Sequence, residues 1–343
     1  MNFRSKSLFL TAAMAVASLP ASAAVITVGA GAGYDYPTLS AAVAAAVAND
    51  RIEIAAGEYL NDFSTINVPL TIEGVGGVAV LNADILIPNG KAFLVTRAAV
   101  TIRNLEFRHA RVTDGNGAGI RAEAGDLTVE NSFFRDNENG ILTISSGSFS
   151  VTVSNLAFID NGAGDGQTHA IYANRIDQLS VFGSTFEGNK VGHDIKSRAR
   201  RTVVSGNMLD DGVSGTTSYA IDLSNGGEGI VTGNTITQGP ATENSAMIAF
   251  GAEGALHAVT SLLVANNTFV NTRPGSSVGV FNHTTIPVTL QGNMFESVSQ
   301  PLVGPGVFLE TQVPAPGAIL LLGLACIGLA VVRRLWRHDA PKR

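Results

Sequence analysis

Ionisable and aromatic side chains recur at fixed distances from three isoleucines of this 343-residue chain, Ile171, Ile195 and Ile221. The residue directly after each isoleucine is, in order, Tyr172, Lys196 and Asp222. The residue two positions before each is His169, His193 and Tyr219, and the residue three positions after each is Asn174, Arg198 and Ser224. If the isoleucines occupy equivalent positions of a repeat, these side chains form parallel rows.

Such a group suits removal of the proton next to the carboxylate of a uronic acid. That reaction requires a base and a positive group that stabilises the enolate-like charge. Lys196 or His193 could act as the base, Arg198 could hold the carboxylate, and Tyr172 could protonate the leaving oxygen. Asp222 could set the protonation state of Lys196 or bind a sugar hydroxyl. The further candidate substrate-binding residues are His169, Tyr219 and Asn174.

The same charges also have a purely structural interpretation, because opposite charges on adjacent strands pair favourably without any ligand. A basic run, Lys196-Ser197-Arg198-Ala199-Arg200-Arg201, nevertheless stands out in an acidic chain. Without the two basic residues of the first 23 and the five basic and one acidic residues of the tail, 15 basic and 27 acidic residues remain, a net charge of −12. This balance argues against nucleic-acid binding and favours a local site for an anionic substrate.

A repeat must position these rows, and the chain contains one. The stretch Leu262-Leu263-Val264-Ala265-Asn266-Asn267-Thr268-Phe269 alternates apolar residues, turns at Asn, and closes on a large apolar residue. Its third position recurs about every 27 residues, within the range of solenoid repeats. These positions are Ile72, Ile102, Val129, Val153, Val181, Val204, Val231, Val264 and Leu290.

Each copy predicts a short strand followed by a bend. One column holds only Asn or Gly, the residues that tolerate a left-handed backbone: Asn104, Asn131, Asn155, Gly183, Gly206, Gly233, Asn266 and Gly292. The next column predicts a ladder of stacked amides at Asn207, Asn234, Asn267 and Asn293. Phe134, Phe158 and Phe186 should fill the interior. We therefore expect an all-β fold, a parallel β-helix of roughly nine to eleven coils.

With these motifs, the chain resembles the right-handed, single-stranded β-helix of the pectin-lyase-like superfamily over about residues 25–310. Ile52-Glu53-Ile54-Ala55-Ala56-Gly57-Glu58-Tyr59 is similar to the first coil of its members. The resemblance implies the fold but not one activity, since members include lyases, hydrolases, epimerases and proteins with no known reaction. Gly192-His193-Asp194 and Asp210-Asp211 resemble polygalacturonase motifs in reversed order, which makes a hydrolase the weaker alternative.

Other segments should cap and line the solenoid. Pro37 and the apolar residues Leu39, Val43 and Val47 predict a short capping helix over 37–50. Two insertions, Asp160–Thr168 and Gln238–Ser245, could wall a groove beside the candidate site. Calcium could bind near Asp160 and Asp165, although their Asp-Asn-Gly and Asp-Gly settings are typical of turns. No other metal or cofactor is expected.

The two ends of the chain are predicted to be targeting segments, and they flank a body of residues 24–312. Residues 1–23 resemble a secretory signal, with Arg4 and Lys6, an apolar run and an Ala21-Ser22-Ala23 cleavage site. Residues 313–343 resemble a PEP-CTERM sorting tail, with Ala315 in place of the usual Glu. The tail predicts a transmembrane segment at 317–332, a cytoplasmic basic end and recognition by a sorting protease.

The sequence therefore predicts an exported, monomeric β-helix protein anchored at the surface of a Gram-negative bacterium. Its expected partners are an anionic polysaccharide, the membrane and the sorting protease. The most plausible activity is that of a uronate lyase or epimerase. The alternative is a non-catalytic carbohydrate-binding or extracellular-matrix protein that uses the same face.

Overall fold

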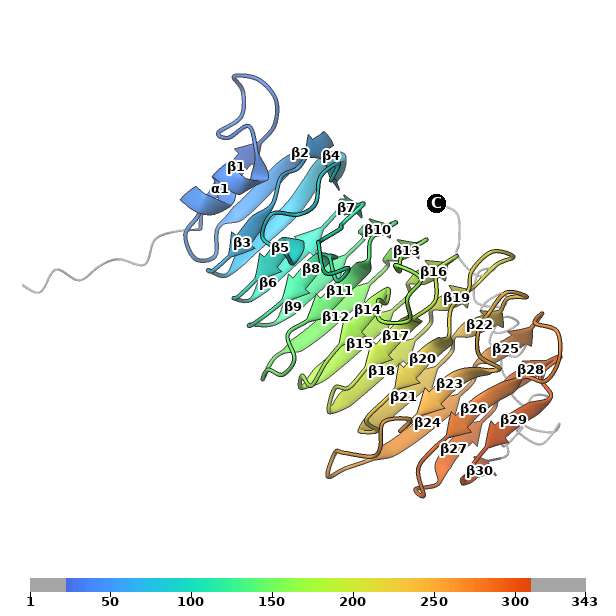
Figure 1. Ribbon diagram of the computed structural model, residues 1–343. Helices are drawn as coiled ribbons and strands as arrows, with labels where there is room; N and C mark the ends of the chain where they lie inside the picture. The colour runs from blue at the N-terminus through green and yellow to red at the C-terminus, as the bar shows by residue number, and fades with distance from the viewer. Residues whose placement is uncertain (1–22, 310–343) are drawn as a thin grey trace, which may run out of the picture.

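The chain winds into a right-handed parallel β-solenoid of about 11 turns, which confirms the predicted fold class. The computed structural model describes residues 23–309. Successive coils stack along one long axis, from the N-terminal cap to the last strands (Figure 1). Each regular coil contributes three short strands, and equivalent strands of neighbouring coils pair in parallel. We call the resulting sets of strands the first, second and third columns.

The first and second columns form one 20-stranded sheet, because the long strands β2 and β4 run through both. The first column comprises β1 (Val25–Val28), β2 (Arg51–Leu60), β4 (Leu70–Asn82), β6 (Val100–Arg103), β9 (Leu127–Glu130), β12 (Ser150–Ser154), β15 (Gln178–Phe182), β18 (Arg201–Ser205), β21 (Glu228–Thr232), β24 (Ser261–Ala265), β27 (Val288–Gln291) and β30 (Gly306–Leu309). The second column continues with β7 (Leu105–Arg108), β10 (Phe133–Arg135), β13 (Ala157–Ile159), β16 (Thr185–Glu187), β19 (Met208–Asp210), β22 (Thr235–Gln238), β25 (Thr268–Asn271) and β28 (Met294–Glu296).

The third column is a separate sheet of 10 strands and carries the candidate site. It comprises β3 (Ser64–Ile66), β5 (Ala92–Thr96), β8 (Ala118–Ala122), β11 (Asn139–Thr143), β14 (Ile171–Ala173), β17 (His193–Ser197), β20 (Tyr219–Leu223), β23 (Ala246–Phe250), β26 (Val278–Asn282) and β29 (Gln300–Val303). Its inward isoleucines pair in register, Ile171 with Ile195 and Ile195 with Ile221.

The repeat positions behave as the sequence predicts. The recurring apolar residues of the first column are buried and pair with one another, as Val153 does with Val181. Every residue of the Asn/Gly column has a positive φ, from 49° at Asn131 to 68° at Gly206. The left-handed bend is therefore repeated coil after coil, and it turns the chain from the first column into the second.

Buried asparagines satisfy the backbone at this bend. The side chains of Asn207, Asn234 and Asn267 each donate to the amide oxygen of the next, at 2.9, 2.9 and 3.0 Å, and the ladder ends at Asn293. Each of these oxygens also accepts a backbone N–H from the preceding coil. A second ladder, which the sequence analysis did not predict, runs through Asn137, Asn161 and Asn189.

Phenylalanines fill the interior beside these ladders. Phe134, Phe158 and Phe186 are buried, and neighbouring rings stack with centroids 4.9 and 4.8 Å apart. The predicted interior column is thereby confirmed. Offset stacking adds to the free energy of area burial, so this column ties neighbouring coils together.

A short helix caps the N-terminal end, as Figure 1 shows, but it is shorter than the predicted 37–50. Helix α1 (Leu39–Ala45) is preceded by the N-cap residue Thr38, whose side chain accepts the N–H of Ala41. The chain leaves the helix at Ala46, and Val47 is exposed rather than packed on the cap. The reason is local: Asp50 accepts the N–H of Val47 and holds this segment in a turn.

The predicted signal segment, apart from Ala23, and the predicted anchor at 317–332 lie outside the described residues. From Ala23 to Leu309, no helix has the length and apolar character that a membrane crossing requires.

Candidate functional site

The third column brings the predicted row together. Tyr172 on β14 pairs in register with Lys196 on β17, and Lys196 pairs with Asp222 on β20. Adjacent strands of a sheet lie ~4.8 Å apart, so the three residues stand side by side on one face. Their neighbours Ile171, Ile195 and Ile221 point into the core. The expected shared face is confirmed, whereas the roles of these residues stay predictions.

Asp222 differs from its expected exposure. Its side chain is only 3% exposed, and that of Lys196 is 13% exposed. Oδ2 of Asp222 lies 3.4 Å from Nζ of Lys196 and accepts the hydroxyl of Ser224 at 2.5 Å. The alternation of residues along a strand predicts to which face a side chain points, but the long side chains beside it decide how much of it solvent reaches. Here these neighbours cover the Asp222 carboxylate. Oδ1 of Asp222 is buried and receives no hydrogen bond from any residue between 23 and 309.

His169, His193 and Tyr219 form a second row, stacked in the direction of the solenoid axis. The rings of His169 and His193 are nearly parallel at 4.9 Å, and the ring of Tyr219 follows at 5.3 Å. Nδ1 of His169 accepts the N–H of His193 at 2.9 Å, and Nδ1 of His193 accepts the N–H of Tyr219 at 3.2 Å. The neutral rings therefore carry their proton on Nε2.

This arrangement makes His193 a poor base. Burial lowers the pKa of His193 to about 4, and the nearby Asp222 opposes this shift only in part. Its Nδ1 lone pair is occupied, and its Nε2 lies 3.4 Å from Asp222 Oδ2. Burial, with the positive charges nearby, also holds the pKa of His169 well below the usual value. Of the two predicted bases, the geometry favours Lys196.

Arg198 connects the rows to Glu253, a residue that the sequence analysis missed. Its guanidinium binds Glu253 through two parallel hydrogen bonds, Nε to Oε2 at 2.7 Å and Nη2 to Oε1 at 2.6 Å. Nζ of Lys196 lies 3.1 Å from the same Oε1. The hydrogen bond from Arg198, together with Lys196, lowers the pKa of Glu253 to about 2. One carboxylate is thus clamped between two cations.

Tyr172 and Asn174 complete this cluster. Nη1 of Arg198 donates to the Tyr172 hydroxyl and, at 3.1 Å, to Oδ1 of Asn174. The cationic groups of Lys196 and Arg198 lie 5.8 and 5.2 Å from the centre of the Tyr172 ring. Burial raises the pKa of Tyr172, so its hydroxyl stays protonated near neutral pH and can donate a proton.

The hydrolase motif does not assemble on this face. Asp194 stands where earlier coils have Gly119, Gly140 and Ala170, and a Cβ atom at Gly140 would lie 2.7 Å from the Phe158 ring. This position points inward. Asp194 is accordingly buried, Oδ1 accepts from Asn189 at 2.7 Å, and burial raises its pKa well above the usual value. Burial also raises the pKa of Asp211. Neither buried carboxyl faces the Lys196 row.

The suggested calcium position behaves as a turn. Asp160 has a φ of 56°, and Oδ1 of Asp165 accepts the N–H of Gln167 at 2.8 Å. Within residues 23–309, no cluster of three or more His, Cys, Asp or Glu side chains is placed to hold a metal ion. The first insertion lies before β14, which carries Tyr172, and the second lies directly before β23, the strand next to β20.

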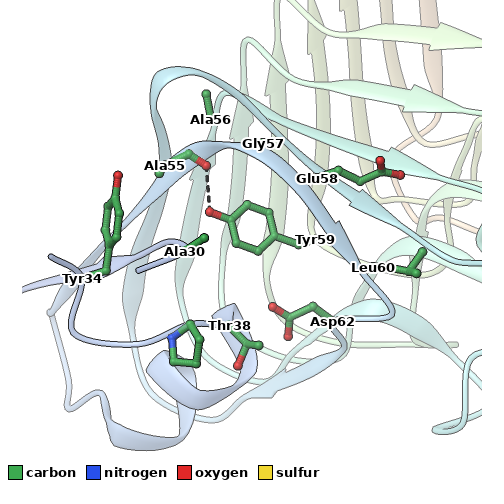
Figure 2. A pocket seen from close by; sticks show the side chains of 11 residues that line it. Ala30, Tyr34, Thr38, Ala55, Ala56, Gly57, Glu58, Tyr59, Leu60 and Asp62 are labelled. Atoms are coloured by element: carbon green, nitrogen blue, oxygen red, sulfur yellow. Dashed lines mark hydrogen bonds between the residues drawn. The ribbon is translucent and has the colours of Figure 1, made fainter. Parts of the chain in front are cut away.

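A cavity of about 540 Å³ lies far from this row, at the N-terminal cap (Figure 2). Tyr34, Tyr59 and Asp62 are among its lining residues. The Tyr59 hydroxyl donates to the Ala55 carbonyl at 2.9 Å, and Asp62 accepts the N–H groups of Leu39 and Ser40 that begin α1. Because Tyr59 and Asp62 are already bound to backbone groups of the cap, they anchor it, and the Lys196 row remains the better candidate.

No family model and no curated protein sequence matches this chain. Solved structures share its fold. An alginate lyase from Paenibacillus sp. strain FPU-7 superposes with a TM-score of 0.55 at 14% identity, over 82% of this chain and 99% of the lyase. At that identity the likeness shows the parallel β-helix alone.

Two further β-helix structures are more distant. The PL6 family alginate lyase AlyGC gives a TM-score of 0.46 at 17% identity, over 84% of this chain and 39% of its own. The pectin methylesterase from Aspergillus niger gives a TM-score of 0.45 at 12% identity, over 87% of this chain and 92% of its own.

Proposed function

We propose that this protein binds an acidic polysaccharide on its third column and removes the C5 proton of a uronate residue, by β-elimination or C5 epimerisation. The observation that carries the proposal is the clamp on Glu253. Lys196 and Arg198 hold its carboxylate at 3.1 and 2.6 Å, on the face that also presents Tyr172. Two cations that share one carboxylate are arranged to bind another one in its place.

Binding would then exchange one carboxylate for another. The substrate carboxylate displaces Glu253 from Arg198, which is suited to hold it through two parallel hydrogen bonds, and Lys196 is left to act as the base. Asn174 offers an amide for sugar hydroxyls. Negative charge spreads onto the substrate carboxylate as the C5 proton leaves, and the fixed positive charge stabilises it.

The proton transfers follow from the same geometry. Lys196, as the neutral amine, takes the C5 proton. In elimination, the electron pair forms the C4–C5 double bond, the C4–O4 bond breaks, and Tyr172 gives its proton to the departing oxygen. In epimerisation, the bond at C4 stays, and a water molecule on the opposite face of C5 gives a proton to that carbon. The hydroxide left behind takes the proton from the Lys196 ammonium, which restores the neutral amine. The stacked rings of His169, His193 and Tyr219 line this face of the protein beside Lys196.

One observation favours the non-catalytic alternative. Every cation of the site already has a carboxylate partner, with Lys196 between Asp222 and Glu253 and Arg198 on Glu253. This is also how a stabilising charge ladder on a sheet looks. A carbohydrate-binding or extracellular-matrix protein would use the face for affinity alone.

The location of the protein is a further part of the proposal and rests on the sequence. The secretory signal and the PEP-CTERM-like tail support export and anchoring at the cell surface. They leave the β-solenoid outside the cell, where anionic polysaccharides occur. There the protein would act as a monomer, anchored in the membrane until a sorting protease processes its tail.

The test is turnover of a panel of uronate polymers by the full-length protein in mild detergent. Alginate, the substrate named for a lyase of the same fold, belongs in the panel with polygalacturonate and glycosaminoglycans. Ultraviolet absorbance reports an unsaturated product, and proton NMR reports a changed ratio of C5 epimers. Either signal supports the proposal. Tight binding without either signal supports the non-catalytic alternative.

A further inference from the structure

A second cationic cluster lies on the same column, three strands from Lys196 towards the N-terminal cap. Arg121 on β8 belongs to the row of Tyr172 and Lys196, because β8 pairs in register with β11 and β11 with β14. At ~4.8 Å per strand, Arg121 and Lys196 are about 14 Å apart. Glu123 belongs to the row of Asn174 and Arg198 by the same spacing.

Charge is out of balance in this cluster. Glu123 contacts Lys91 at 2.5 Å, Arg97 at 2.9 Å and Arg121 at 3.5 Å. No other carboxylate of the described chain pairs with these three side chains. Three positive charges therefore surround one negative charge, whereas Lys196 and Arg198 are balanced by Asp222 and Glu253. An uncompensated positive charge of two on an acidic protein attracts anions.

Burial strengthens that attraction. The neighbours of Arg121 along the row are Val95 and Leu142, which are both buried. The Glu123 side chain is 10% exposed and that of Arg121 is 21% exposed, whereas those of Lys91 and Arg97 are 39% and 48% exposed. Solvent therefore screens the charge of Arg121 less than the charges of the other two cations. Nε of Arg121 is buried and lies 3.5 Å from Oε1 of Glu123, too far for a hydrogen bond, so Glu123 neutralises this arginine only weakly.

We propose that Lys91, Arg97 and Arg121 form a distal anion subsite for a second carboxylate of the same polysaccharide chain. This inference rests on the proposed function, because the first carboxylate lies at Lys196 and Arg198. The glycan then runs along the solenoid axis from Lys196 across Tyr172 to Arg121. Longer chains reach both cationic clusters, and short ones reach only the first, so affinity rises with chain length.

The experiment is calorimetric titration of the full-length protein in mild detergent with oligouronates from the dimer to the octamer. It uses a Lys196→Arg background, which keeps the positive charge and removes the proposed base, so the oligomers stay intact. Affinity should rise once the oligomer spans about 14 Å. Adding Arg121→Ala should reduce the ratio of long-chain to short-chain affinity by about tenfold, as the loss of one charged hydrogen-bonding partner implies.

Two controls make the result specific. Arg121→Lys keeps the charge and should retain part of the length dependence. Arg103→Ala removes an arginine that pairs with Glu130 on the first column at 2.6 Å, and it should leave the length dependence unchanged. Thermal unfolding checks that each variant is folded, which we expect because Glu123 keeps Lys91 and Arg97 as partners in Arg121→Ala.

The two proposals fail separately. An affinity that does not depend on length, or an Arg121→Ala series that coincides with its parent, overturns the distal subsite. Absence of turnover by the unmodified protein overturns the proposed chemistry, while a length dependence that Arg121→Ala removes would still establish the subsite.

Discussion

Replacing Glu253 with Gln should make the protein bind anionic oligosaccharides more tightly. In the unmodified protein, the substrate carboxylate must displace that of Glu253 from Lys196 and Arg198. The variant keeps the shape of the side chain but changes the local charge from zero to plus one. The effect is opposite to that expected of an ordinary binding residue, whose loss weakens binding.

The magnitude follows from the exposure of the pair. The Glu253 side chain is 37% exposed, so its ion pairs are screened and contribute about 1 kcal/mol together, the upper end for surface pairs. Since 1.4 kcal/mol changes an equilibrium constant tenfold, Kd should fall roughly fivefold. Because the pKa of Glu253 is about 2, the competition persists at all pH values at which the protein is assayed.

Calorimetric titration with one uronate oligomer of fixed length measures this change. Glu228→Gln is the matched control, because it removes a carboxylate that lies 3.9 Å from Arg201 on the first column. It should leave Kd unchanged, as should either variant with a neutral oligosaccharide. Weaker or unaltered uronate binding by Glu253→Gln would refute the idea that Glu253 occupies the place of a substrate carboxylate.

Three other predictions concern stability and location. Asp194 has a raised pKa in the folded protein, so its contribution to stability is complete below the unfolded pKa of ~3.9 and is lost as the pH rises through the folded pKa. Asp194→Asn should therefore flatten the dependence of Tm on pH above pH ~4. Parallel Tm profiles of the variant and the unmodified protein would contradict this. Phe158→Ala should cost about 3–5 kcal/mol in denaturant unfolding, whereas Phe182→Ala, at an exposed ring, should cost far less; equal losses would argue against the Phe stack. A chain of residues 24–312 should be soluble and monomeric, while the full chain fractionates with membranes; a freely soluble full chain that retains 317–332 would exclude the anchor.

The repeat was predictable from the sequence because the same pattern of apolar residues followed by Asn or Gly recurs in each coil. A left-handed bend admits few residue types, so Asn104 and Gly206 mark equivalent positions although the residues directly beside them differ. The same periodicity placed Tyr172, Lys196 and Asp222 in one row.

The parts that were missed lie where the coils are irregular. Glu253 follows β23 at two residues beyond the position equivalent to Ser224, and a turn with Gly251 at a φ of 72° brings it back over the site. Coil spacing alone cannot place such a residue. At β17 the alternation of side chains is broken, so that His193 lies on the outer face and Asp194 points inward. Strict alternation along a strand does not predict such a break. A weak signal existed, since Gly119 and Gly140 occupy the position of Asp194 on earlier coils.

The central claim is that Lys196, as the neutral amine, removes a proton from a uronate whose carboxylate is held by Arg198. The most direct test is the turnover of Lys196→Arg on the polymer that the unmodified protein transforms. Arginine keeps the charge beside Asp222 and Glu253, so the fold and uronate affinity should be retained, but its guanidinium stays protonated and cannot act as a base. We predict a loss of turnover on the order of 10²-fold or more, with Kd within a few-fold of the unmodified protein. Turnover by Lys196→Arg close to that of the unmodified protein would contradict the account.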